Sequence, residues 1–286
     1  KAWAGRTMDE IGIVGLDATD EEAKEIYKDC KRRHYEGFPW NDDKKRWELL
    51  HKEVQRTLQA IETDPPLPMC WEHRCNDKKE FMRVFRKALR TGQTHMAGKT
   101  TEKKFTMSWL SPTSPKDLAT YIPNDQTLYL HPWALSHFRR CDVVLLAYHE
   151  ILGHHYQEAR AAENKYYTSS AESEMCGMWC EALASKHLNG IMKAAHEWYL
   201  SRLVRAQVDL RLHSRAIKRH CEQSAMKLWE ISPVIGKHIM PLRDELVRCA
   251  SIPSQAQSYV LFKSDKSKYC GCPRPTQAFR GPTSGK

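Results

Sequence analysis

Hydrophobic positions in the first hundred residues recur at the three- and four-residue steps of amphipathic α-helices. The two stripes consist of Trp47, Leu50, Val54, Leu58 and Ile61, and of Phe81, Val84, Phe85 and Leu89. The segment 63–68 between them contains three prolines, which lack the amide donor and restrict the residues before them. The pattern therefore predicts two core-facing helices that are separated by a linker.

The remainder of the chain alternates between one extended segment and long helical stretches. Residues 98–117 are rich in Lys, Thr, Ser and Pro, which indicates an exposed loop and a domain boundary. Residues 126–133 suit a pleated surface and end with a proline, so they form the best strand candidate. Helical periodicity covers 141–164, 169–189, 192–229 and 238–250.

These patterns predict a mainly α fold with a small β element. We expect a helical N-terminal region at 1–100, a catalytic domain at 101–263 and an irregular tail at 264–286.

Composition narrows the class of protein. With 286 residues, 41% hydrophobic and 28% charged, the chain is expected to be globular rather than disordered or collagen-like. No apolar run approaches the roughly 18 residues of a membrane span. Ten scattered cysteines and the lack of a glycosylation sequon favour a reduced, cytoplasmic setting. Because the chain opens on Lys1 rather than Met, its N-terminal context stays open.

The net charge of +10, from 45 Lys and Arg against 35 Asp and Glu, permits a polyanionic partner. Basic residues gather in one helical region, at Lys186, Lys193, Arg202, Arg211, Arg215, Lys218 and Arg219. No aromatic-interleaved recognition motif accompanies them, so nucleic acid is not the favoured partner. The sequence gives no indication of oligomeric state.

The segment that carries candidate chemistry is Tyr148-His-Glu-Ile-Leu-Gly-His-His-Tyr-Gln157, which follows the apolar run 143–147. A zinc hydrolase needs neutral imidazoles to hold the metal and an adjacent carboxylate to accept a proton from water. His-Glu-x-x-His provides them on one helical face. Here His149 and the next histidine, His154, are five residues apart.

A regular α-helix would place His149 and His154 about 140° apart, whereas an i,i+4 pair lies about 40° apart. One extra residue, accommodated as a π-bulge that Gly153 tolerates, would bring the two rings together. We therefore predict His149 and His154 as metal ligands and Glu150 as general base. His155 would contact substrate or support a ligand, although it remains an alternative second ligand. The other interpretation is that a histidine-rich helix end caps itself.

A third ligand is expected on a neighbouring helix. In the run 171–183, Glu174, Gly177, Met178 and Glu181 share one stripe of a helix otherwise suited to the core. Buried acids must be paired or bound to a cation, so we assign Glu174 as ligand. Glu181 would hydrogen-bond a ligand's free ring nitrogen. Alternatively both acids face solvent.

Cys176 and Cys180 fall on the opposite face and are interpreted as small core residues.

A further stripe places Arg205, Asp209 and His213 at i, i+4 and i+8. On a solvated face this is a salt-bridged stripe. On a buried face Asp209 could orient the other two toward a substrate oxyanion or carboxylate.

Together these segments resemble the zinc-metallopeptidase-like family known as domain of unknown function 885. Its blocks are His-Glu-x-x-Pro-Gly-His-His-x-Gln, Glu-Gly-Trp-Ala-x-Tyr-x-Glu, Arg-x-x-x-Asp-x-Gly-x-His and Pro-Gly-Gln-Ala-x-x-Tyr. The corresponding segments here are His149-Glu-Ile-Leu-Gly-His-His-Tyr-Gln157, Glu174-Met-Cys-Gly-Met-Trp-Cys-Glu181, Arg205-Ala-Gln-Val-Asp-Leu-Arg-Leu-His213 and Pro253-Ser-Gln-Ala-Gln-Ser-Tyr259. The first block is also similar to the His-Glu-Leu-Leu-Gly-His of dipeptidyl peptidase III.

The resemblance implies a gluzincin-like helical catalytic domain with zinc on two His and one Glu. It also implies that Tyr259 stabilises the oxyanion and that Arg248 matches a residue of the family pattern. In this family picture, the strand at 126–133 would border the cleft and could pair with an extended substrate. The chain departs from the family by lacking the proline of the first block, and it is about half the family's length, as a catalytic portion or a shortened relative would be.

The expected function is hydrolysis of an amide bond in short peptides, of carboxypeptidase or dipeptidase type. Glu150 would act as base, His213 or Tyr259 would stabilise the oxyanion, and Arg205 or Arg248 would hold a substrate carboxylate. The alternatives are a former peptidase fold that binds polyanions, and a zinc enzyme that acts on a non-peptide substrate.

Overall fold

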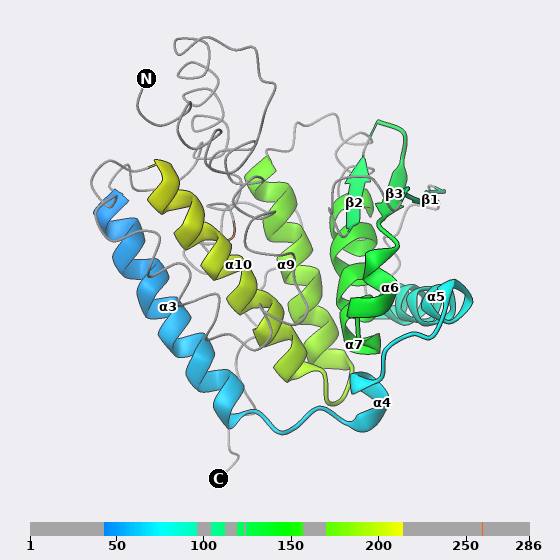
Figure 1. The fold of residues 1–286 in the computed structure, drawn as a ribbon, viewed down its shortest axis with the longest axis horizontal. Helices are drawn as coiled ribbons and strands as arrows, with labels where there is room; N and C mark the ends of the chain where they lie inside the picture. The colour runs from blue at the N-terminus through cyan, green and yellow to red at the C-terminus, as the bar shows by residue number, and fades with distance from the viewer. Residues whose placement is uncertain are drawn as a thin grey trace. The chain divides into compact units, whose positions relative to one another are not determined.

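The computed structural model describes residues 43–95, 104–111, 119–122, 124–156, 170–213 and 259. These residues are mostly helical and include a small three-stranded sheet (Figure 1), which confirms the mainly α class. The chain forms two compact units, each of which gathers separate parts of the sequence. The domains expected from the sequence are instead continuous segments.

The first unit contains most of helix α3 (Asp43–Thr63) and of helix α10 (Met192–His213). Leu50 and Val54 of the predicted α3 stripe are fully buried. Burial, with a smaller contribution from the charge of Glu53 in α3, raises the pKa of Tyr199 in α10. The core of this unit is therefore built from the apolar faces that the sequence marks. Helix α3 ends at Thr63, before the non-helical residues 65–68, which confirms the proline linker.

The second unit carries the helices that matter for the site. Helix α5 (Lys78–His95) packs against α7 (Arg140–Leu146) and against the π-helix η1 (Ala147–His155). Phe81, Phe85 and Leu89 of α5 are buried, as their spacing predicts. The remaining helices are α4 (Met69–Glu72), α6 (Trp133–His137) and α9, which spans Ser170–His187.

The sheet has the order β1-β3-β2, with β1 (Thr106–Trp109), β2 (Ala119–Ile122) and β3 (Thr127–Leu130). Strand β3 confirms the extended segment predicted at 126–133. It pairs in parallel with β1 and antiparallel with β2. Strand β1 lies in the stretch 98–117, whose composition predicted an exposed loop. Its four residues obtain their order from β3, a distant partner that local composition does not reveal.

The central position of β3 corrects one expectation. Because both edges of β3 are already paired over Thr127–Leu130, this strand cannot add an extended substrate backbone.

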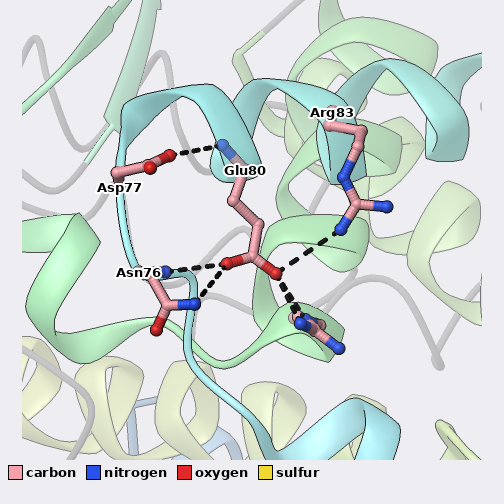
Figure 2. Close-up of polar contacts among 5 residues, drawn as sticks. Asn76, Asp77, Glu80 and Arg83 are labelled. Atoms are coloured by element: carbon pink, nitrogen blue, oxygen red, sulfur yellow. Dashed lines mark hydrogen bonds and ion pairs between the residues drawn. The ribbon is translucent and has the colours of Figure 1, made fainter.

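The start of α5 is fastened to the start of α7 through Glu80, around which Figure 2 shows Asn76, Asp77 and Arg83. Glu80 accepts hydrogen bonds from the backbone N and side-chain Nδ2 of Asn76, both at 3.0 Å, and from Nε of Arg140 at 3.1 Å. Its own amide donates to Oδ1 of Asp77 at 2.7 Å. The segment that leads into η1 is therefore held at its N-terminal end by a charged network.

The described cysteines are thiols, and Cys75, Cys141, Cys176 and Cys180 are buried. Burial raises the pKa of Cys75 to about 11, so this thiol stays protonated at neutral pH. Cys176 and Cys180 are core residues, as expected from the sequence. Within the described ranges, no helix combines the length and apolar character that crossing a membrane requires.

The Glu80 network predicts an acid-sensitive contribution to stability. The backbone hydrogen bond from Asn76, followed by the bond from Arg140, lowers the pKa of Glu80 below its ordinary value of 4.5. A lowered pKa in the folded state stabilises the fold above the ordinary value, and this stabilisation is lost as pH falls through the lowered value. Glu80→Gln should therefore unfold at lower urea concentration than wild type at pH 7, and the difference should shrink at pH 3. A control, Glu72→Gln on the exposed surface of α4, should show no such convergence; an equal effect at both pH values for Glu80→Gln would contradict the prediction.

Candidate metal centre

A π-helix brings the two predicted histidine ligands together. Helix α7 continues into η1 without a break, and seven consecutive residues from Ala147 to Gly153 are buried. Nε2 of His149 lies 3.0 Å from Nε2 of His154, and the two rings are perpendicular. The wider i→i+5 winding puts residues five apart on one face. The predicted π-distortion is therefore confirmed, and it extends over nine residues.

Glycines allow η1 to approach α9 closely. A Cβ atom added to Gly153 would lie 2.5 Å from Cα of Gly177, so the two backbones meet with no side chain between them. A Cβ added to Gly177 would lie 2.5–2.9 Å from three atoms of the His149 ring. Gly177 thus leaves the space that the imidazole of His149 fills. Gly177 lies on the predicted stripe that faces the site, but its steric role was not predicted.

Glu174 of α9 completes a group of three possible ligands. Its Oε2 lies 3.5 Å from Nε2 of His149, and the two side chains are 13% and 6% exposed. One ligand atom from each of His149, His154 and Glu174 lies within 4.8 Å of the others. This is the one such group of three or more His, Cys, Asp or Glu residues that the described part of the chain contains. The sequence stripe that led to Glu174 therefore faces the histidines and not solvent.

Each imidazole is held from behind at its other nitrogen. Oε1 of Glu181 lies 2.6 Å from Nδ1 of His149, which is the contact expected for this residue. Oγ of Ser173 lies 2.8 Å from Nδ1 of His154. A histidine that donates Nδ1–H to an oxygen presents the lone pair of Nε2 to a cation. Ser173 was missed in the sequence, where a hydroxyl within a helix has no distinctive signature.

Two of the three spacings between donor atoms are close to those around a tetrahedral metal ion. Two nitrogens bound at about 2.0–2.1 Å in tetrahedral geometry lie about 3.3 Å apart. The distances from Nε2 of His149, 3.0 Å to His154 and 3.5 Å to Glu174, lie on either side of that value. All three ligand atoms lie within 4.8 Å of one another, so the three side chains could hold one metal ion once they draw together around it.

The two histidines that follow one another in the sequence face different partners. His154 is half-buried and joins the cluster. His155 is 1% exposed, and its Nδ1 lies 2.6 Å from the hydroxyl of Tyr121 in β2. The rings of Phe105 and Tyr156 also contact His155. The structure thus groups His154, and not His155, with His149 and Glu174.

The other predicted site residues are distributed over both compact units. Glu150 follows His149 in η1 and is buried, at 8% exposure. Asp209 is also buried, which excludes a fully solvated stripe on this face of α10, and Arg205 is half-buried. Arg205, Asp209 and Tyr259 belong to the first compact unit, and the three possible ligands belong to the second. The side chain of His213 and the whole of Arg248 lie outside the described residues.

Arg202 of α10 bears on the polyanion alternative. Only 6% of it is exposed, and its guanidinium lies over the rings of Trp198 and Tyr259 at 5.2 and 5.6 Å. Tyr259 is itself buried. Arg202 is therefore part of a packed aromatic cluster and not of a basic surface.

No protein-family model matches the sequence, and no curated protein matches it. The fold is similar to a crystal structure described as that of "the putative lipoprotein from Colwellia psychrerythraea", with a TM-score of 0.58 and 16% sequence identity. The similarity covers 87% of this chain and 48% of that one, so the chain spans about half the length of that protein. At this identity the similarity shows the fold alone.

The contact between Gly177 and His149 predicts an unusual effect of a single methyl group. Alanine exceeds glycine in helix propensity by about 1 kcal/mol, so Gly177→Ala should keep α9 helical. The added Cβ would displace the His149 ring from Glu174, and we expect zinc affinity to fall by at least about ten-fold. Calorimetric titration with zinc, together with circular dichroism, measures both effects. Cys176→Ala, which adds no atom, should bind zinc as wild type does; unchanged affinity in Gly177→Ala would show that the ring has room to move.

Proposed function

We propose that the chain is a zinc-dependent hydrolase that cleaves an amide bond in short peptides. The observation that carries the proposal is the cluster of His149, His154 and Glu174, whose ligand atoms lie within 4.8 Å of one another, with an oxygen atom beside Nδ1 of each imidazole. Nitrogen and carboxylate donors in this combination are typical of catalytic zinc sites, which use three protein ligands and keep a fourth position open.

Charge also favours a divalent cation. Glu174 and Glu181 place two carboxylates against His149, and their side chains are only 13% and 6% exposed. Burying carboxylates is costly unless they are paired or bound to a cation. A dication balances two carboxylates while both imidazoles stay neutral, which is the state in which histidine binds a metal.

Zinc in such a site supplies a Lewis acid that makes water nucleophilic at neutral pH. Glu150 would accept the proton of the attacking water on its carboxylate and pass it to the leaving amine. Its position next to His149 in η1, in an interior largely shielded from solvent, supports this role. His155 would support the site from the side of β2, through its contact with Tyr121.

The other roles are extensions of the resemblance to the domain of unknown function 885 and its gluzincin-like fold. In that scheme Tyr259 or His213 stabilises the oxyanion, and Arg205 or Arg248 binds a substrate carboxylate, with Asp209 orienting Arg205 and His213. A free carboxylate on the substrate would favour carboxypeptidase or dipeptidase specificity over cleavage within a long chain. The partial match of four sequence blocks in the same order supports this assignment.

Metal analysis tests the first step of the proposal. Wild type should purify with, or take up, about one zinc per chain, and His149→Ala and Glu174→Ala should each lose it. His51→Ala, which changes an exposed histidine of α3, should keep it. A wild-type protein that cannot be loaded with zinc would exclude the proposed enzyme.

A library of short peptides tests the second step. Zinc-loaded wild type should release new amino termini, and Glu150→Gln should lower the rate by about 100-fold or more while keeping its zinc, because the general base is removed. Hydrolysis that persists in Glu150→Gln would leave the metal site but reject Glu150 as the base. Binding to a polyanion that is steeply salt-dependent and unaffected by loss of His149 would favour the binding-module alternative.

A further inference from the structure

Two neighbouring histidines compete for one position in the proposed metal site. His154 and His155 have the same donor chemistry and follow one another at the end of η1. Consecutive residues of a helix point in different directions, and the i→i+5 winding of η1 places His154 on the face of His149. Contacts from other elements then hold each ring in its orientation.

Each of the two rings is held by a hydroxyl from a different element. Nδ1 of His154 lies 2.8 Å from Oγ of Ser173 in α9, and Nδ1 of His155 lies 2.6 Å from the hydroxyl of Tyr121 in β2. Ser173 directly precedes Glu174 in the chain. Helix α9 therefore holds the second histidine and supplies the third ligand from adjacent residues.

The first histidine has less freedom than the second. His149 is 5% exposed as a residue, and its ring lies against Gly177 and 2.6 Å from the buried carboxylate of Glu181. His154 is only half-buried, and its contact behind the ring is a neutral hydroxyl. The orientation of the His154 ring is therefore less constrained than that of the His149 ring.

We infer that Ser173 is a positioning residue that fixes His154, and not its neighbour His155, as the second metal ligand. When Nε2 of His154 binds the cation, Nδ1 is protonated, and this N–H donates a hydrogen bond to Oγ of Ser173. The serine thereby sets both the tautomer and the orientation of the ring. This inference rests on the proposed metal site and adds a residue that the sequence motif does not contain.

Ser173→Ala removes the acceptor and should weaken zinc binding by about 10- to 100-fold, the usual range for loss of an outer hydrogen bond to a ligand. It should also change the visible spectrum of the cobalt-substituted protein, because a reoriented His154 alters the ligand field. Ser173→Thr keeps a hydroxyl at the same position and should restore both properties. The matched control is Ser185→Ala in the same helix, whose hydroxyl bonds the backbone oxygen of Ala182 and not a ligand.

The zinc-binding results distinguish a failure of the role of Ser173 from a failure of the proposed metal site. Wild type that binds no zinc contradicts the metal site itself. Wild type that binds zinc, beside a Ser173→Ala variant with the same affinity and cobalt spectrum, overturns the role of Ser173 alone. Nitrogen-15 spectra of the histidine rings in wild type provide a test that needs no variant. Zinc should shift the ring nitrogens of His154 to the metal-bound range and leave His155 unbound; the reverse assignment would overturn the inference.

Discussion

The π-helical winding of Ala147–His155 is the constraint on which the rest of the site depends. It puts His149 and His154 on one face, which a regular α-helix with this sequence could not do. A π-helix is wider than an α-helix, so its neighbours must make room. Gly177 in α9 meets the His149 ring, Gly92 in α5 meets Leu152 and Tyr148, and Gly153 meets the backbone of α9. The π-helical winding and the three glycines around it therefore depend on one another.

The π-helix η1 is also held in place through α7, the helix that leads into it. Arg139 and Asp142 cap the beginning of α7 through a bidentate ion pair, at 3.0 and 3.1 Å, and Arg140 reaches Glu80 at the start of α5. These contacts fix the direction in which α7 enters η1, and buried side chains of α5 then lie along η1. A rigid entry matters because a shift in η1 would move both histidines together relative to Glu174. The ion pairs at the start of α7 therefore contribute to the position of the two histidines relative to Glu174.

The sequence predicted the elements whose signals are local. The five-residue spacing of His149 and His154 implied a π-distortion, and the buried acids of 171–183 indicated Glu174 and Glu181. Strands β1 and β2 were not predicted, because four-residue strands owe their order to pairing with β3. The same limit applies to Ser173 and to the steric role of Gly177, since both become visible only where α9 meets η1. Local patterns identify the donors, whereas the contacts that orient the donors depend on tertiary packing.

The site forms where a short stretch of α9 meets η1. On α9 the residues that face η1 are Ser173, Gly177 and Glu181, at successive steps of four, with Glu174 beside them. On η1 the corresponding step is five, from His149 to His154. Because η1 spans only Ala147–His155, this step of five occurs once between the two ligands. The contacts that α9 makes with the two imidazoles come from the short stretch Ser173–Glu181. Ser173 and Glu181 contact a ring nitrogen, Gly177 leaves space for a ring and Glu174 supplies a carboxylate.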